Sequence, residues 1–274
     1  MERRPVIHWH GVCWNEADML PRFLAHYRPF VDKFVILDDG STDGSIDILS
    51  KERKVEFHLT NRPVDESYIL YNTSMYNEEW KSSRGQCNWV IVGNIDEFVY
   101  NRDISAYLAR CTAAGVTAVP ALGFDMVRRE PVKPGAQLLS AVRNGTQSQA
   151  MSRFAIFNPD AIEETNYGPG RHACEPEGKI VIPERDRTLN LHFKLIGFDE
   201  TYRRMKQQDA RRNKMEKDRG FGAQYGWPYE KFSTYWNNVE RNCLDVLTWY
   251  KNDLPYVPRP WWRDPERGLE VRTL

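Results

Sequence analysis

The chain has 274 residues, and its 38 lysine and arginine residues balance its 38 aspartate and glutamate residues. This length suits one large α/β domain, or one domain with a C-terminal extension, and it can bury a sizeable core. A formal net charge of zero provides no overall positive field that would favour nucleic acid as a partner.

Cysteine usage and hydropathy bear on the compartment. The five cysteines form no CxxC pair, and an odd, scattered set predicts reduced thiols. The opening residues MERRPVIHWHGV lack the apolar region of a signal peptide. No apolar stretch approaches the roughly 20 residues of a membrane span. We therefore expect a cytoplasmic protein without a transmembrane segment; peripheral association with the inner face of the membrane and the oligomeric state stay open.

The first part of the chain alternates between short apolar strands and helices. Asn15 can cap the first helix, with Glu16 in its first turn, and apolar residues then recur with helical spacing from Leu20 to Tyr27. Short connections between strands and helices predict a parallel sheet. The expected strands are 6–12, 34–37, 55–59 and 89–92, and the later helices are a short one through Ile46 and Leu49 and a longer one over 68–81.

The second part of the chain predicts further strands, a loop and a helical end. Residues 123–145 are rich in Pro, Gly and Arg and suggest a loop, while Asp103 and Asp199 can each cap a helix. We expect the first of these helices to run through Leu108, the second to about Arg219, and another helix over about 230–249 before a Pro-rich end. The remaining expected strands are 116–122, 154–157, 180–182 and 189–193.

The stretch from Asn88 to Tyr100, NWVIVGNIDEFVY, combines a buried-strand pattern with acidic residues. The run from Trp89 to Val92 is followed by Asn94, Asp96 and Glu97. In open α/β sheets, ligands bind beyond the carboxyl ends of the strands, and carboxylate oxygens suit Mg²⁺ or Mn²⁺. A metal site is one interpretation of this stretch, and a solvated turn is the other.

Charged residues also stand near the ends of two other elements. Asp38 and Asp39 close the second expected strand, and only one of them can face a cleft because successive side chains alternate. Asp39 could accept a hydrogen bond from a nucleobase or a ribose. Lys81 and Arg84 precede the central strand and could neutralise phosphates. An Asp-Gly turn and an ordinary basic helix end are the alternatives.

Three more residues are candidates for metal binding or proton transfer. His192 ends an apolar strand and could complete a coordination shell begun by Asp96, although a lone histidine in such a strand more often belongs to the core. His172 and Glu175 lie in a glycine-rich loop, and either could act as a general base. Loops also carry polar residues that have no function.

Taken together, the motifs resemble those of family 2 type glycosyltransferases with the GT-A fold, in particular a bacterial branch. That branch has the motifs NE…L…H, DDGSTDG and W…D-x-DEF, matched here by Asn15-Glu16 with Leu20, Leu24 and His26, by 38–44, and by Trp89 with 94–98. The match covers about the first 125 residues, with a weaker echo in LHFK at 191–194.

The resemblance implies a Rossmann-like, mostly parallel sheet flanked by helices and a metal-dependent transfer of a sugar. Residues 1–197 would form the GT-A-like domain, with a nucleotide-sugar half over 1–125 and an acceptor half over 126–197, and the aromatic-rich 198–274 would be a helical extension packed on it. The donor would be a nucleoside-diphosphate sugar and the acceptor a hydroxyl of a glycan, with inversion expected, in surface polysaccharide synthesis.

The resemblance also assigns residues within that site. Asp39 matches the aspartate that contacts base or ribose, and Asp96 matches the last aspartate of the D-x-D motif, which binds Mn²⁺ or Mg²⁺. His192 matches a histidine that some GT-A enzymes use as a further metal ligand. Asn15, Glu16, Lys81, Arg84 and Asn94 are expected on the donor side. Asn94 departs from the family pattern, which usually has aspartate, and this puts the metal affinity in doubt.

Two other function classes remain open from the sequence. A catalytically silent sugar- or nucleotide-binding relative would explain Asn94 as a degraded metal-site residue. A nucleotidyltransferase would share the parallel sheet and an acidic metal site, but the chain has no Gly-rich, basic phosphate loop after its first expected strand.

Overall fold

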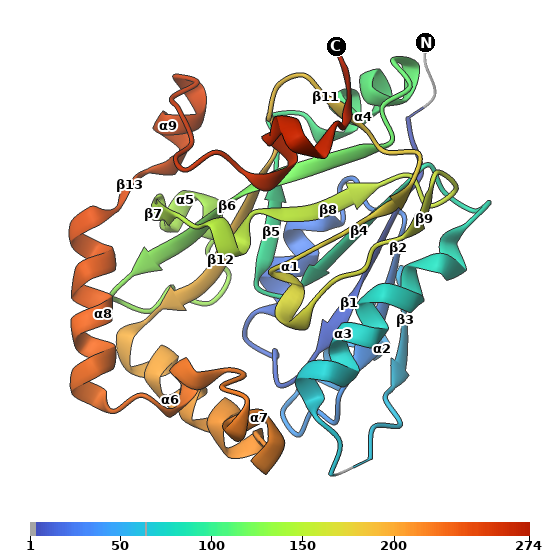
Figure 1. The fold of residues 1–274 in the computed structure, drawn as a ribbon. Coiled ribbons are helices and arrows are strands. Elements are labelled where there is room, and N and C mark those ends of the chain that lie inside the picture. Colours follow the sequence, from blue (N-terminus) through green and yellow to red (C-terminus); the bar gives the residue numbers. More distant parts are fainter. Residues whose placement is uncertain (1–3, 64) are drawn as a thin grey trace.

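A large mixed β-sheet with helices on both faces forms the body of the protein (Figure 1). The structure is a computed structural model that describes residues 4–63 and 65–274. The sheet has ten strands in the order β13-β7-β6-β8-β4-β1-β2-β3 along its main path, and β12 joins it by pairing with β6 and β5. The chain is therefore α/β, as expected from the alternation of strands and helices.

The strands forming the sheet are β1 (Ile7–Cys13), β2 (Lys33–Asp38), β3 (Val55–Leu59), β4 (Trp89–Asn94), β5 (Glu97–Tyr100), β6 (Ala118–Arg128), β7 (Asn144–Gln147), β8 (Arg153–Phe157), β12 (Leu189–Ile196) and β13 (Leu244–Asp245). Two small pairs lie apart from it, namely β9 (Ile162–Glu164) with β10 (Glu177–Gly178), and β11 (Val181–Pro183) with β14 (Glu270–Arg272). The helices are α1 (Leu20–Tyr27), α2 (Ser45–Lys51), α3 (Tyr68–Glu78), α4 (Ile104–Ala113), α5 (Leu138–Ala141), α6 (Phe198–Arg211), α7 (Lys214–Asp218), α8 (Tyr229–Asn242) and α9 (Val246–Lys251).

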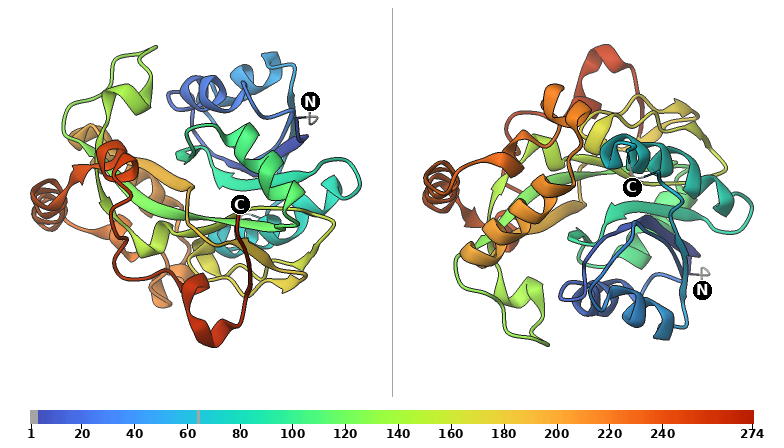
Figure 2. Two further views of the ribbon diagram at one scale, coloured as in Figure 1. Left: turned by 90° about the horizontal axis from the view of Figure 1, so that it is seen from above. Right: turned by 90° about the horizontal axis from the view of Figure 1, so that it is seen from below.

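The first four strands confirm the predicted parallel arrangement. β3, β2, β1 and β4 pair in that order and all run parallel. Every residue of β1 is buried, as befits a strand between two neighbours and two layers of side chains. Helices α1 and α2 lie on one face of this half of the sheet and α3 lies on the other (Figure 2).

The second half of the sheet is not mostly parallel. β8 runs antiparallel to both β4 and β6, and β7 and β5 also pair antiparallel with their neighbours. The predicted loop over 123–145 is wrong in three places. β6 continues to Arg128 with Phe124 and Met126 buried, α5 occupies 138–141, and β7 begins at Asn144. Gly123, which suggested a loop, lies in close contact instead: a Cβ there would come within 2.2 Å of the Met151 carbonyl carbon.

Helix ends differ from the predictions at several points. α1 begins at Leu20, after Met19, so Asn15 does not cap it. α6 begins after Gly197 rather than at Asp199, and it ends at Arg211, where a capping box formed by Asn213 and Glu216 begins the separate helix α7. The helix predicted over about 230–249 is divided into α8 and α9 by the short strand β13. The predicted helix cap at Asp103 is confirmed, because its side chain accepts a hydrogen bond from the Ala106 backbone.

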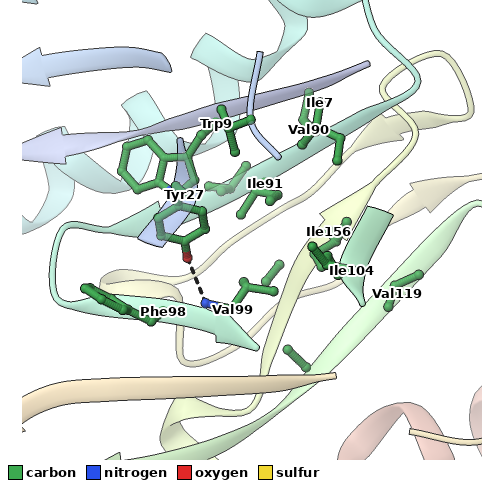
Figure 3. Packing of buried hydrophobic residues seen from close by; sticks show 14 of the residues in the cluster. Ile7, Trp9, Tyr27, Val90, Ile91, Phe98, Val99, Ile104, Val119 and Ile156 are labelled. Atoms are coloured by element: carbon green, nitrogen blue, oxygen red, sulfur yellow. Dashed lines mark hydrogen bonds between the residues drawn. The ribbon is translucent and has the colours of Figure 1, made fainter. Parts of the chain in front are cut away.

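An aromatic cluster between α1 and the sheet holds the turn that follows β4 (Figure 3). The Trp9 ring packs 4.6 Å from Phe23, centroid to centroid, and lies over Gly11, where a Cβ would come within 2.5 Å of that ring. The Tyr27 hydroxyl donates to the Glu97 carbonyl at 2.9 Å and accepts from the Val99 N–H at 2.8 Å. These two bonds fix the start of β5 against α1.

The C-terminal residues 198–274 are mainly helical and aromatic-rich, but they also supply the paired strands β13 and β14. Trp249 and Trp262 are buried in the main hydrophobic core, while Phe232 and Trp236 form a second cluster with α6. Over the described ranges, no helix combines the length and the hydropathy that crossing a membrane requires.

Candidate active site

A cavity of about 630 Å³ opens where the carboxyl ends of β1 and β4 face α3 and α6. Its walls come from segments far apart in the chain, which include Trp14, Tyr76, Asp96, His192 and Arg204. A neighbouring cavity of about 590 Å³ shares Glu16, Asp96, Lys194 and Arg204 with it. Asp96 therefore stands on the boundary between two hollows at the edge of the sheet, which is the position expected for ligand binding in an α/β fold.

Asp96 and His192 meet in this cavity, as the sequence predicted. Their Oδ2 and Nε2 atoms are 3.4 Å apart, and Nδ1 of His192 lies 2.7 Å from Oδ1 of Asp125. Burial lowers the pKa of His192, but the two carboxylates outweigh it and raise that pKa to about 10. Burial raises the pKa of Asp96, but the charge of His192 overrides it and holds the pKa well below its usual range.

Strand pairing explains why these three side chains converge. β12 lies between β5 and β6, with His192 in register with Glu97 on one side and with Asp125 on the other. The Phe193 N–H donates to the Asp96 carbonyl at 2.8 Å, which fixes the β4–β5 turn against β12. The site is therefore built on paired strands, which hold it more rigidly than loops would.

Cations outnumber acids in the lining of the larger cavity. Glu16 and Asp96 are the acidic residues among its described lining, and the cations are Arg153, Arg171, Lys194, Arg204 and Arg211. Lys194 and Arg204 act on Asp96, and their charge helps to lower its pKa. A lining with this balance attracts an anionic ligand.

Asn94 lines the cavity, but both ends of its amide are engaged. Its Nδ2 donates to Oε1 of Glu97 at 2.8 Å, and its Oδ1 accepts from the Tyr76 hydroxyl. Glu97 is buried and receives a 2.6 Å hydrogen bond from Arg171. Burial raises the pKa of Glu97, but Arg171 and Arg153 outweigh it and lower that pKa to about 2. Asn94 thus connects the cavity lining to a buried network formed with Tyr76 and Glu97.

The two candidate bases in the glycine-rich loop are separated by the structure. His172 lines the cavity, and its Nδ1 lies 3.0 Å from the Ala150 carbonyl oxygen. A carbonyl can only accept, so Nδ1 carries the proton and Nε2 keeps its lone pair. Burial and the charge of Arg153 lower the pKa of His172, which keeps it neutral. Glu175 is outside the described lining, is exposed, and pairs with Arg267, so the expectation of a base at this position gains no support.

Asp39 is buried and already bonded on both carboxylate oxygens. Oδ1 accepts from Thr60 at 2.9 Å and from Arg62 at 3.1 Å, and Oδ2 pairs with Arg211. The Arg211 guanidinium lies 3.8 Å from the Trp14 ring centroid and 4.6 Å from that of Tyr68. The position that the sequence predicted for base or ribose is thus held by an arginine of α6.

The Asn15-Glu16 pair lies at the mouth of the smaller cavity. Asn15 has a φ of 51° and accepts from the Thr42 N–H at 2.7 Å, so it supports the loop after β2. Glu16 lines both cavities and pairs with Arg204. Burial raises the pKa of Glu16 to about 8, with Arg204 opposing the rise.

Lys81 and Arg84 do not reach either cavity, although the sequence suggested phosphate contacts. Lys81 pairs with Glu78 and Glu164. Arg84 donates to backbone carbonyl groups of 159, 162 and 163 and lies over the Trp80 ring. Both cations tie the end of the α3 segment to the β9 region, a structural role.

Sequence reasoning missed Asp125, Arg153, Arg171 and Lys194 as site residues. Asp125 and Arg153 lie in strands, where a single charge gives no sign of which long-range partner it faces. Arg171 and Lys194 lie next to candidate residues in the sequences GPGRH and LHFK. Their closeness to His172 and His192 in the sequence could have identified them as site residues. Arg204 and Arg211, which also line the larger cavity, lie on helix α6.

The donor set fits a divalent cation only in part. Asp96 offers an oxygen ligand, and His192 offers Nε2 only after losing the proton that its raised pKa favours, with Asp125 behind it as the carboxylate that orients many metal-bound histidines. Across the part of the chain that the structure describes, no group of three or more His, Cys, Asp or Glu side chains is arranged to hold a metal. Mg²⁺ commonly takes its remaining ligands from substrate phosphates and water, so a two-residue site suits it.

Comparison with known proteins adds no family assignment. The chain matches no protein-family model, and it matches no curated protein. Its function must therefore be argued from the cavity and from the motifs.

Proposed function

We propose that the protein is a GT-A-fold glycosyltransferase that moves a sugar from a nucleoside-diphosphate sugar to a hydroxyl of a glycan acceptor. The observation that carries the proposal is the Asp96–His192 pair, backed by Asp125, at the edge of a cavity rich in cations. The parallel strand order β3-β2-β1-β4, followed by β8, which runs antiparallel to both β4 and β6, suits the GT-A comparison.

The residues would divide the work as follows. Asp96 and His192 would hold a divalent cation, which when bound would neutralise charge on the leaving diphosphate. Lys194 and Arg204 would bind phosphate oxygens and stabilise the same charge. Nε2 of neutral His172 would take the proton of the acceptor hydroxyl. Inversion at the anomeric carbon and a role in surface polysaccharide synthesis belong to the same proposal through the family resemblance.

A thermal-shift panel tests the proposal. UDP, GDP, ADP and dTDP, and their glucose conjugates, would each be added with and without Mn²⁺. At a hundredfold excess over Kd, binding stabilises the folded state by roughly 2.7 kcal/mol. We expect one base to stabilise the protein in the presence of Mn²⁺, and Asp96→Ala to remove that stabilisation. Glu163→Gln, at an exposed carboxylate, is the matched control.

Product analysis separates the proposed transferase from its alternatives. Mn²⁺-dependent release of a nucleoside diphosphate supports sugar transfer or its hydrolytic side reaction. Release of pyrophosphate would indicate nucleotidyl transfer. Binding without any release, across donors of the preferred base, would indicate a silent binding protein. If none of the nucleotides shifts the melting temperature, the proposal is wrong.

A further inference from the structure

Two buried arginines beside the cavity share a single carboxylate. The side chains of Arg153 and Arg171 are 1% and 0% exposed, and that of Glu97 is 2% exposed. Arg171 is well bonded, with Nη2 2.6 Å from Oε2 of Glu97 and Nη1 2.8 Å from the Val92 carbonyl oxygen. Its guanidinium also lies 4.6 Å from the Tyr76 ring centroid. Arg171 and Glu97 thus form a complete ion pair.

Arg153 has no comparable partner among the described residues. Its Nη2 is 3.4 Å from Oε1 of Glu97, its Nη1 is 3.4 Å from Nδ1 of His172, and its third contact is 3.6 Å from the Met151 sulfur. Within the described ranges neither its Nε atom nor that of Arg171 has a hydrogen-bond partner, so the two arginines differ in their Nη contacts. All three contacts are long for a charged donor, and the contact with His172 pairs two donors because Nδ1 of His172 carries the proton.

The charges in this region do not balance. Two guanidinium groups and one carboxylate leave one positive charge, and His172 offers no compensation because an imidazole carries no negative charge. Asp96 is engaged by His192, 3.4 Å away, and among the described residues no ion pair joins it to these arginines. An uncompensated buried cation costs free energy that a bound anion would recover. This side of the cavity is therefore short of one negative charge.

The location allows a ligand to supply that charge. Arg153 and Arg171 both line the larger cavity, beside Met151, Gly170 and His172. They contact Glu97 at 3.4 and 2.6 Å, whereas Arg204 pairs with Glu16 and Lys194 lies 3.4 Å from the Tyr225 hydroxyl. The two cationic groups are therefore distinct. The planar fork of arginine matches the oxygens of carboxylate and phosphate groups.

We propose that Arg153 and Arg171 form an anion subsite that takes a carboxylate or phosphate group carried by a sugar, separate from the donor diphosphate. The inference rests on the proposed function and narrows its substrates to acidic sugars, such as a uronate or a sugar phosphate. Arg153 supplies the positive charge that the ligand would meet. Arg171 holds Glu97 in place, so that Glu97 neutralises Arg153 only in part.

The first experiment measures binding of acidic and neutral sugars without nucleotide. Glucuronate and glucose 6-phosphate would be titrated against glucose by calorimetry, with inorganic phosphate as a further probe. We expect the acidic sugars to bind the wild type at least tenfold more tightly than glucose, and Arg153→Met to lose that preference. Equal affinity for acidic and neutral sugars in the wild type, or an unchanged preference in Arg153→Met, would overturn the proposal.

Thermal stability separates a binding role of Arg153 from a structural one. Because Arg153 makes only long contacts, Arg153→Met should melt at the wild-type temperature or above it in the absence of ligand. Arg171→Met is the matched comparison, since it breaks the 2.6 Å bond to Glu97 and should melt several degrees lower. Equal losses in the two variants would mean that Arg153 is structural and would count against the subsite.

A second pair of titrations identifies which substrate carries the anion. If the donor carries the anion, Arg153→Met weakens the binding of UDP-glucuronate at least tenfold relative to the binding of UDP-glucose in the presence of Mn²⁺. If the acceptor carries the anion, the variant loses affinity for glucuronate or glucose 6-phosphate added together with UDP. Failure of every nucleotide in the thermal-shift panel to bind would contradict the proposed function alone, because the sugar titrations without nucleotide decide the subsite independently.

Discussion

The Nε2 atom of His192 lies 3.4 Å from Oδ2 of Asp96, although 96 residues separate them in the chain and each belongs to a different strand region. Asp96 lines both cavities. We expect Asp96→Ala to abolish Mn²⁺-dependent nucleotide binding while the fold survives, because its side chain makes no other described hydrogen bond. Calorimetry with and without Mn²⁺ measures the effect. Unchanged Mn²⁺ dependence in the variant would contradict the assignment of Asp96.

Asp125 should act through His192 rather than by touching the cation. Its Oδ1 lies 2.7 Å from Nδ1 of His192, on the side away from Asp96. Removing such a carboxylate typically weakens metal binding by about 10- to 100-fold, because the imidazole loses orientation and basicity. We expect Asp125→Asn to weaken Mn²⁺ binding in this range, as measured by electron paramagnetic resonance of free Mn²⁺. Asp125→Glu, which restores a carboxylate, should recover part of the affinity, whereas equal affinity in all three proteins would argue against His192 as a ligand.

Local sequence patterns predicted the elements that carry the site better than they predicted its contacts. The strand from Trp89 to Val92 and the helix from Leu20 to Tyr27 follow from local apolar spacing, and the structure confirms both. The β5 strand after Asp96 went unrecognised, because four residues that follow an acidic turn resemble a loop. Its pairing with β12 is what brings His192 to Asp96.

Long-range ion pairs account for most of the remaining differences. Asp39 matched a nucleotide-binding motif, yet its partner Arg211 lies 172 residues later in the chain. Glu175 and Arg267 are 92 residues apart. No local pattern indicates such pairs, because a charged side chain has the same local spacing whether it faces solvent, a ligand or a distant partner.

Asn94→Asp should destabilise the protein rather than tighten metal binding, although it restores the residue that the family motif usually has. The amide Nδ2 is 2.8 Å from Oε1 of Glu97, so the substitution replaces a donor with a second carboxylate in a buried site. The loss should be about 1–3 kcal/mol of the free energy of unfolding in urea. Asn94→Ala, which removes the same bonds without adding charge, is the control. If the Asp variant is as stable as the Ala variant, the two carboxylates do not repel as argued.

Protonation of His26 should weaken the fold in mild acid. Its Nε2 lies 2.8 Å from the Val99 carbonyl oxygen, and its ring stacks on Phe98 at 4.8 Å between centroids. Burial lowers the pKa of His26 to about 4, with the bond to Val99 opposing the shift. The unfolded chain takes up the proton near pH 6.5. The neutral ring therefore stabilises the folded state above that pH, and this contribution is lost as the pH falls from about 6.5 to 4.

The size of this effect can be isolated by substitution. Between pH 7 and pH 5, the wild type should lose about 2 kcal/mol more of its free energy of unfolding than His26→Gln, which keeps a donor for the Val99 carbonyl but does not titrate. Urea unfolding at the two pH values measures the difference. His58→Gln, at a histidine whose side chain is 55% exposed, is the control and should retain the wild-type pH dependence. The same acid loss in His26→Gln as in the wild type would show that His26 is protonated in the folded protein, so that its contacts with Val99 and Phe98 do not exclude the charge.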